Sequence, residues 1–199
     1  MEFCLNNEKL CVRVSSLGAE LRSVRGADGT EYLWQGDERF WRGRATNIFP
    51  YVGRLTEDSY LWRGARYKMG RHGFARGSEF TAEAATDTRL ILSLRAGEAT
   101  RESYPFDFKF SLIYELSGDT LRQTYCVENR GEGDMPFGLG GHPGFNVPLA
   151  EVRGLPPGVF RALRAAARPA LAPVLRLRRG SALRARKQRH TAPPRPLRR

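Results

Sequence analysis

The sequence predicts an all-β protein whose antiparallel strands form a sandwich. Three observations support this prediction. Short runs of alternating apolar and polar residues recur along the first 149 residues, Gly-, Asp- and Ser-containing turns separate them, and no long helical pattern lies between them. Parallel α/β sheets require crossover helices, so the sequence favours antiparallel strands joined by hairpins.

The predicted elements follow from these local patterns. We expect strands at residues 10–14, 19–24, 80–84, 89–95, 106–116 and 120–129, and a hairpin over residues 60–69 that turns at Arg63-Gly64. Residues 98–103 favour one helical turn, which Pro105 ends. Residues 35–58 form a long irregular stretch rich in Gly, Arg and aromatic residues, and we expect it to line a site.

Charge divides the chain into two unlike segments. The net charge is +12, but residues 150–199 contain thirteen Arg, one Lys and one acid, which leaves −1 for residues 1–149. The basic segment also holds seven prolines, too many for a continued sandwich. We therefore expect a β domain over residues 1–149 and a disordered Arg/Ala/Pro-rich tail over residues 150–199.

The basic charge could indicate a nucleic-acid or membrane partner that binds through the tail. We expect neither, since the excess is confined to the tail and lacks interleaved aromatic residues. Cys4, Cys11 and Cys126 have neither metal-site spacing nor the even count of a disulfide framework, so we expect buried free thiols and no metal. The N-terminus shows no signal peptide and no apolar run reaches about 18 residues, which predicts a cytoplasmic protein.

Two of the three histidines lie in Gly-flanked loops beside predicted strands. His72 stands in RHGFARG and His142 in GGHPGFN, whereas His190 lies in the tail. A loop histidine suits general acid or base catalysis, although each also fits a structural role. Arg54, in PYVGRL, offers a fork of donors for hydroxyls or a phosphate, or it braces the fold. No nucleophile elbow, phosphate-binding loop or dinucleotide fingerprint is present, so the chemistry reduces to proton transfer or to binding alone.

Several motifs in one order carry a family resemblance that covers residues 10–149. They are GAEL, DGTEYLWQGD, NIFPYVGRL, HGFARGSEF, YPFDFKFSLIYEL and MPFGLGGHPGFNVPL. In this order they resemble the aldose 1-epimerase (galactose mutarotase) family, in particular its bacterial LacX-like branch. The resemblance implies a galactose mutarotase-like supersandwich that interconverts the α and β anomers of an aldohexose or hexose phosphate without a cofactor.

The resemblance also implies a role for each candidate residue. His142 would protonate the ring oxygen, His72 would contact the sugar, and Arg54 would hydrogen-bond the sugar hydroxyls. Phe74 and Phe145 flank the two histidines and could stack on a sugar face, but we expect both to pack in the core. The family's glutamate base belongs to a later region, which has no counterpart here: after Leu149 the acids are Glu151 and the terminal carboxyl.

The tail composition is typical of an out-of-frame translation of a GC-rich gene. Codons for residues 153–159, read one base later, permit Glu-Asp-Tyr-Leu-Leu-Glu, which resembles this branch. We hypothesise a frameshift near Glu151 or Val152 and expect a truncated sandwich with impaired catalysis. A carbohydrate-binding module without catalysis is the alternative.

Overall fold

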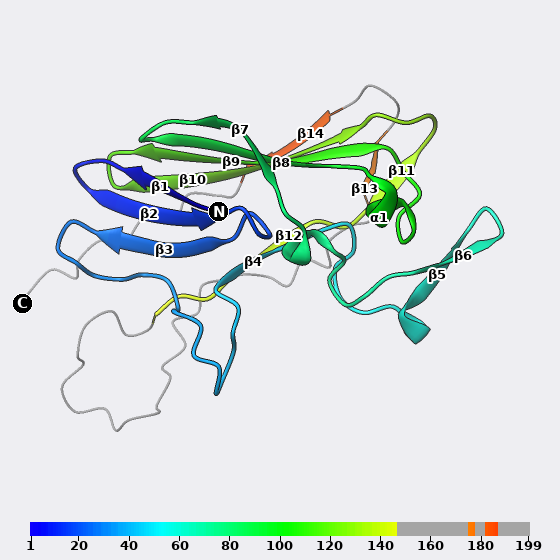
Figure 1. Cartoon of the computed structure of the whole chain (residues 1–199), viewed down its shortest axis with the longest axis horizontal. Coiled ribbons are helices and arrows are strands. Elements are labelled where there is room, and N and C mark those ends of the chain that lie inside the picture. The colour runs from blue at the N-terminus through cyan, green and yellow to red at the C-terminus, as the bar shows by residue number, and fades with distance from the viewer. Residues whose placement is uncertain (147–174, 178–181, 187–199) are drawn as a thin grey trace, which may run out of the picture.

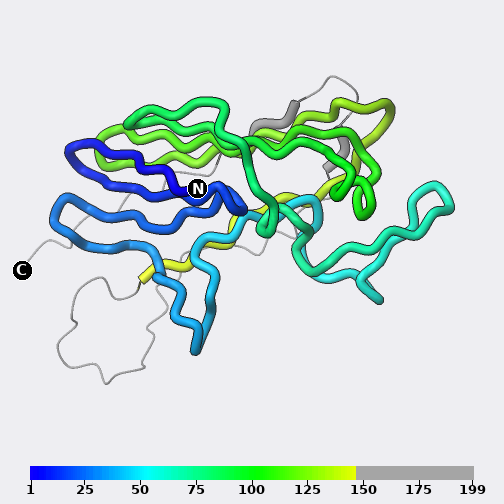
Figure 2. Tube along the Cα trace, in the orientation of Figure 1, coloured from blue at the N-terminus to red at the C-terminus, as the bar shows by residue number. Residues whose placement is uncertain are grey.

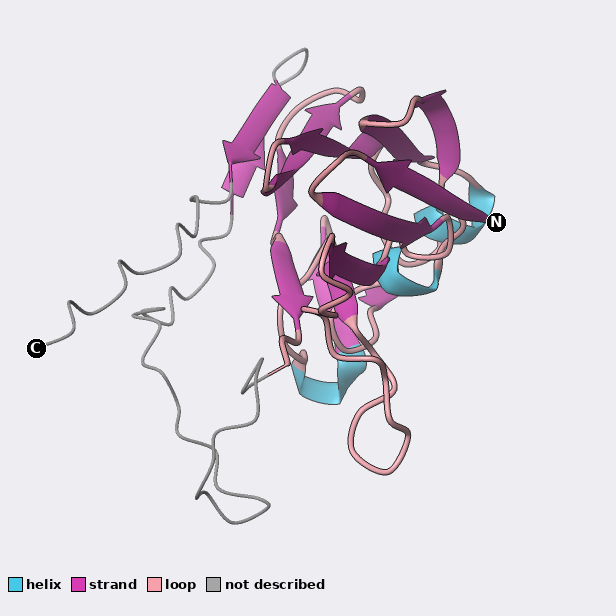
Figure 3. Ribbon diagram, turned by 90° about the vertical axis from the view of Figure 1, so that its left-hand side faces the viewer, coloured by secondary structure: helices cyan, strands magenta, loops and turns pink. Residues whose placement is uncertain are grey.

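The computed structural model describes residues 1–146, 175–177 and 182–186, and its architecture is two facing antiparallel sheets (Figure 1). Strands dominate, while the helical elements are single short turns (Figure 3). The strands are β1 (Glu2–Asn6), β2 (Leu10–Ser15), β3 (Leu21–Gly26), β4 (Ala45–Ile48), β5 (Ser59–Trp62), β6 (Ala65–Lys68), β7 (Thr81–Ala85), β8 (Arg89–Arg95), β9 (Phe108–Ser117), β10 (Thr120–Asn129), β11 (Met135–Phe137), β12 (Gly140–Pro143), β13 (Leu175–Leu177) and β14 (Ala182–Arg186). The helical turns are η1 (Thr56–Asp58), η2 (Ala75–Gly77) and α1 (Glu98–Arg101).

Alternation of side chains along the strands builds the core between the two sheets. One sheet has the order β1-β2-β3 and the other the order β14-β10-β9-β8-β7. Strands β9 and β10 pair along their full length, from Thr120 opposite Ser117 to Asn129 opposite Phe108. Every second residue of β9 faces inward and is buried, and these residues join inward-facing residues of β1–β3 in one apolar cluster. The antiparallel sandwich predicted from the sequence is thus confirmed.

Phe49 lies at the centre of the aromatic part of this core and is fully buried. Its ring stacks on Phe110 with centroids 4.6 Å apart and also contacts Phe74, Phe108 and Phe137. Because Phe49 directly follows β4, this packing attaches the irregular stretch of residues 35–58 to the large sheet. Hairpin β5–β6, in cyan, extends away from both sheets (Figure 2).

Most predicted strands lie within two residues of their observed bounds, and the turn at Arg63-Gly64 and helix α1 also occur as expected. Strands β1, β4, β11 and β12 were not predicted. Three of them have only three or four residues, too few to show a period of two, and they exist because distant segments pair with them. The thiols depart from expectation too: Cys126 is buried, but Cys4 is exposed on β1 and Cys11 is half-buried.

Two segments of the predicted tail form strands, where the sequence predicts none. Strand β13 pairs with β11, and β14 pairs with β10 at the edge of the large sheet. Edge strands present unpaired N–H and C=O groups, which pair with another backbone whatever its side chains. The rest of the tail predicted to be disordered, and the hypothesised frameshift, lie outside the described residues. Within the part of the chain that the structure describes, no helix is long and apolar enough to span a membrane.

A buried amide fastens β4 to both sheets. The Asn47 Nδ2 group donates to the carbonyls of Gly18 (3.0 Å) and Ala19 (2.8 Å), and its Oδ1 atom accepts from Gln123 Nε2 (2.9 Å) and Tyr125 OH (3.0 Å). The side chain therefore uses two donors and two acceptor positions in a site closed to water. A buried polar group in such a network is costly to replace, because its partners lose their hydrogen bonds.

We predict that Asn47→Leu lowers the free energy of unfolding by about 2–4 kcal/mol, because four buried polar groups lose a partner. Tyr125→Phe is the matched control, since it removes one donor and leaves Gln123 on Asn47; we expect a loss of about 1 kcal/mol. Urea unfolding followed by circular dichroism measures both. An Asn47→Leu protein as stable as the wild type would contradict this account of the network.

Candidate active site

His142 lies on β12, which pairs antiparallel with β4 although the two strands are far apart in sequence. The sequence predicted a loop here; the pairing with β4 makes it a strand. His142 stands opposite Thr46, and directly opposed residues of an antiparallel pair point to the same face. The His142 imidazole is exposed and meets the indole of Trp41 edge to face, with ring centroids 5.0 Å apart. The β4–β12 pair thus presents His142 to solvent on a defined face.

His72 lies in the predicted loop, between β6 and η2, in the left-handed backbone region with φ +68°. Two hydrogen bonds with Gly53 hold it there: the His72 N–H donates to the Gly53 carbonyl (2.8 Å), and the Gly53 N–H donates to His72 Nδ1 (3.1 Å). Since Nδ1 accepts, the neutral ring carries its proton on Nε2. That N–H is a donor suited to a sugar hydroxyl.

The surroundings of His72 favour its neutral form. Partial burial is the largest cause that lowers the pKa of His72 below its ordinary value of 6.5. The positive charges of Arg71 and Arg76 act in the same direction. His142 contributes as well, which places the two histidines in one electrostatic neighbourhood.

A close backbone contact fixes the His72 loop on the core. Gly73 has φ +72°, and a Cβ atom added to it would lie 2.2 Å from the carbonyl oxygen of Phe49. That carbonyl accepts hydrogen bonds from the N–H groups of Phe74 and Ala75, both at 3.1 Å. Only glycine allows the backbone to come this close, so the loop can pack against Phe49 because residue 73 is glycine. Phe74 packs against the apolar core, as predicted, whereas Phe145 is 58% exposed, against the expected core packing.

Arg54 directly follows Gly53, the residue that is hydrogen-bonded to His72. Its guanidinium is bound by Asp58, with Nε to Oδ1 at 2.8 Å and Nη2 to Oδ2 at 2.7 Å. This pair raises the pKa of Arg54 and lowers that of Asp58. The structure thus places His72 and His142 near enough for their charges to interact, and it places Arg54 next to the residue that is hydrogen-bonded to His72. Within the described residues, no hydrogen bond joins the Arg54 side chain to either imidazole.

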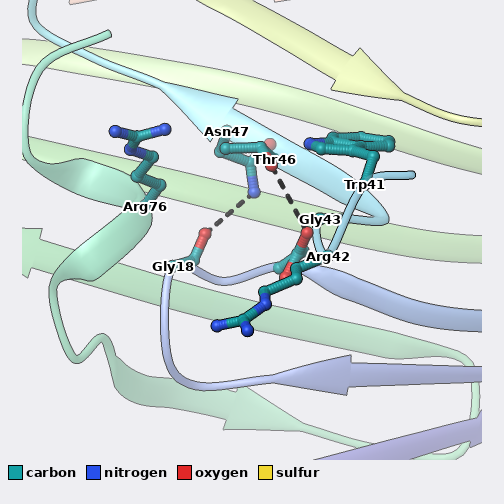
Figure 4. Close-up of a pocket in the computed structure, with 8 residues that line it drawn as sticks. Gly18, Trp41, Arg42, Gly43, Thr46, Asn47 and Arg76 are labelled. Atoms are coloured by element: carbon teal, nitrogen blue, oxygen red, sulfur yellow. Dashed lines mark hydrogen bonds between the residues drawn. The ribbon is translucent and has the colours of Figure 1, made fainter. Parts of the chain in front are cut away.

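A cavity of about 350 Å³ lies beside β4 and η2 (Figure 4), and His72, His142 and Arg54 are not among the described residues that line it. Trp41 and Thr46, the two neighbours of His142, lie on its wall, and Arg76, whose charge acts on His72, lies on the other side. Neither Trp41 nor Arg76 was expected at a site from the sequence. The signal that could have indicated Trp41 was the prediction that the aromatic- and Arg-rich stretch of residues 35–58 lines a site, and residues of this stretch do line the cavity. The complete lining is Gly18, Glu20, Trp41, Arg42, Gly43, Thr46, Asn47 and Arg76.

Glu20 is the one carboxylate in the lining of this cavity, and its oxygens are already bonded. Oε1 accepts the backbone N–H groups of Arg44 (2.8 Å) and Ala45 (3.0 Å), and Oε2 pairs with Arg22 at 3.0 Å. These contacts hold the backbone at the start of β4, so Glu20 has a structural role there. Within the described residues, no three His, Cys, Asp or Glu side chains gather to hold a metal ion.

We predict that protonation of His72 destabilises the fold. Because the pKa of His72 is lower in the folded state, the unfolded chain binds more protons as the pH falls below about 6.5. The contribution of His72 to the free energy of unfolding is therefore complete above pH 6.5, and it is lost as the pH falls through the folded-state pKa. His72→Asn, whose residue type tolerates positive φ, removes this titration. Unfolding free energies measured from pH 7.5 to pH 5 should fall more steeply for the wild type. The other histidines titrate in both proteins, so parallel profiles would refute this role of His72.

Residues 1–154 match the sequence model of the family described as Aldose 1-epimerase. Protein LacX (plasmid) of Lactococcus lactis subsp. lactis is 36% identical over 153 residues, which cover 74% of this chain and 51% of LacX. A galactose mutarotase related enzyme from Lactobacillus acidophilus is 38% identical with a TM-score of 0.75, over 78% of this chain and 52% of that one.

A galactose mutarotase-like protein from Lactobacillus casei ATCC 334 is 34% identical with a TM-score of 0.72, over 74% of this chain and 50% of that chain. The chain therefore spans about half the length of the relatives it matches. Residues 1–154, which match the family model, contain the β4–β12 pair, the His72 loop and the residues that line the cavity. On this sequence and this fold, the chain belongs to the aldose 1-epimerase family.

Proposed function

We propose that the protein acts on aldohexoses or hexose phosphates as an aldose 1-epimerase, opening and reclosing the sugar ring to interconvert α and β anomers. The observation that carries the proposal is the pair of histidines near a cavity, with the imidazole of His142 exposed and the pKa of His72 lowered by partial burial. Ring opening needs one proton delivered to the ring oxygen and one removed from the anomeric hydroxyl. No step requires a metal or an organic cofactor.

In this proposal His142 donates the proton to the ring oxygen. Its exposed imidazole contacts Trp41 and points to the same face as Thr46, on the cavity wall. His72 donates its Nε2–H to a sugar hydroxyl and orients the ring. Arg54 binds other hydroxyls through the N–H groups that Asp58 leaves available, since Asp58 engages Nε and one Nη2 hydrogen.

Among the described residues we assign none as the general base. Glu20 is committed to backbone N–H groups and Arg22, and the family resemblance implies a glutamate from a later region of the fold. We therefore propose that catalysis is impaired in this chain. The same observation favours a second candidate function, a carbohydrate-binding module that holds a sugar or sugar phosphate without turning it over.

We predict that the full chain accelerates the decay of optical rotation of freshly dissolved α-D-galactose or α-D-glucose only weakly, because it lacks an assigned general base. His142→Ala should abolish the acceleration that remains, since a general acid contributes about 100-fold or more. His190→Ala, at the histidine to which the proposal gives no role, should behave as the wild type. Saturation-transfer NMR on the same samples reports sugar binding independently of turnover. Binding without acceleration in the wild type would support the binding-module function, and acceleration that survives His142→Ala would contradict the acid role.

A further inference from the structure

Two cysteines lie next to each other on hairpin β1–β2 of the smaller sheet. The sulfur atoms of Cys4 and Cys11 are 3.9 Å apart, although the two residues are seven positions apart in the sequence. The register sets Cys4 opposite Arg13 and Cys11 opposite Asn6. The cysteines are therefore diagonal neighbours, and their side chains point to the same face of the sheet. Pairing of the two strands thus creates a dithiol.

The two thiols of this pair differ from the third in their access to solvent. Cys4 is exposed and Cys11 is half-buried, whereas Cys126 is buried on β10. An external reagent can therefore reach Cys4, where Cys11 lies beside the same sulfur atom. Among the described residues, neither β1 nor β2 contributes to the lining of the cavity, so this dithiol is separate from the candidate active site.

The position of β1 in its sheet allows the two sulfur atoms to come together. A disulfide bond is about 2.0 Å long, so the gap between the sulfur atoms must close by about 1.9 Å. Strand β1 stands at the end of the order β1-β2-β3, and in the described residues β2 is its only partner strand (Figure 1). An edge strand shifts more easily than a central strand, because it is held on one side only. Diagonal neighbours lie further apart than a disulfide prefers, so the bond is strained and easily reduced again.

Charged groups stand beside both thiols. Cys4 lies opposite Arg13 and Cys11 lies opposite Arg25 in the register of the sheet. Desolvation is the largest cause that raises the pKa of Cys4 above its ordinary value of 9.0, and the contact with Cys11 raises it further. The nearby charges act in opposite directions, since Arg13 lowers this pKa and Glu2 raises it. Reaction at this site therefore depends on the nearness of a second thiol, and the two arginines attract an anionic reagent.

We propose that Cys4 and Cys11 form a thiol–disulfide exchange site, at which an anionic low-molecular-weight disulfide oxidises the pair and clasps β1 to β2. The Cys4 thiol loses its proton to water, and its thiolate attacks one sulfur of the small disulfide, which breaks that S–S bond and releases one thiolate. The Cys11 thiol loses its proton in turn, and its thiolate attacks the Cys4 sulfur of the mixed disulfide. This step forms the Cys4–Cys11 bond and releases the second thiolate. The pair loses two electrons, and the small disulfide gains them and becomes two thiols.

The hairpin is hydrogen-bonded to the segment that positions β4. The N–H group of Ser16 donates to the carbonyl of Met1 at 2.8 Å, and the turn that follows contains Gly18, whose carbonyl accepts Asn47 Nδ2 at 3.0 Å. The clasp therefore restrains a strand whose first residue is tied to the start of that turn. Because a clasped β1 separates from β2 less often, we expect amide hydrogen exchange of residues 2–6 to slow several-fold on oxidation.

Glutathione disulfide is the probe that tests the site. The full chain is incubated with it, quenched with acid, alkylated and digested with trypsin, and the peptides are identified by mass spectrometry. Trypsin cuts after Lys9, so Cys4 lies in peptide 1–9 and Cys11 in peptide 10–13. We expect these two peptides to be linked after oxidation, with a mass two hydrogens below their sum, and to separate on treatment with dithiothreitol.

Three variants identify the part of each thiol. Cys126→Ser removes the buried thiol and is the matched control, which should give the same linked peptides as the wild type. Cys11→Ser removes the second thiol of the pair and should stop at a mixed disulfide between Cys4 and glutathione. Cys4→Ser should react several-fold more slowly than Cys11→Ser, because the thiol that it retains is half-buried.

The outcomes decide the proposal independently of the proposed catalysis, in which neither cysteine has a role. Linked peptides in the wild type and Cys126→Ser, and in neither variant of the pair, support the exchange site. Full alkylation of all three cysteines in the treated wild type overturns it, and so does a mixed disulfide at Cys4 that persists although Cys11 is present. Crosslinked dimers on a non-reducing gel, without linked peptides in the monomer, also overturn it, because Cys4 then reacts as a single exposed thiol.

Discussion

The hydrogen bonds of Asn47 are the interaction on which the geometry of the site depends. Strand β4 is only four residues long and pairs with the equally short β12, so backbone pairing alone would hold it weakly. The buried amide connects it to the turn at Gly18 and to Gln123 and Tyr125 on β10. The position of β4, and through its register that of His142, is thereby tied to both sheets.

Close backbone approaches provide the second constraint. Gly73 docks against Phe49, the residue at the centre of the aromatic core, and so places His72 in a backbone conformation that most residues avoid. Gly43 and Gly144 serve the indole of Trp41 in the same way. These glycines are the points where the backbone comes closest to other atoms, and the candidate residue His72 directly precedes one of them, Gly73.

The candidate site combines two histidines with a cavity whose carboxylate has a structural role. The His142 imidazole is exposed, partial burial lowers the pKa of His72, and the cavity is lined by the ring of Trp41 and the side chain of Arg76. The carboxylate nearest to this cavity, that of Glu20, is engaged in holding the backbone of β4. The described residues thus combine two exposed or partly exposed imidazoles with a cavity whose lining carboxylate has a structural role.

The sequence by itself determined the sandwich class and the long strands β8, β9 and β10, because alternation and local turn chemistry are encoded residue by residue. It also indicated His72, His142 and Arg54 as candidate site residues, through their loop motifs and the family resemblance. It could not reveal β4 and β12, which are too short for periodicity and exist only as partners of each other. Nor could it reveal Trp41 and Arg76, because they reach one cavity only after residues far apart in the chain have packed together. Tertiary structure decides such convergence, since it depends on contacts between distant segments that no local pattern records.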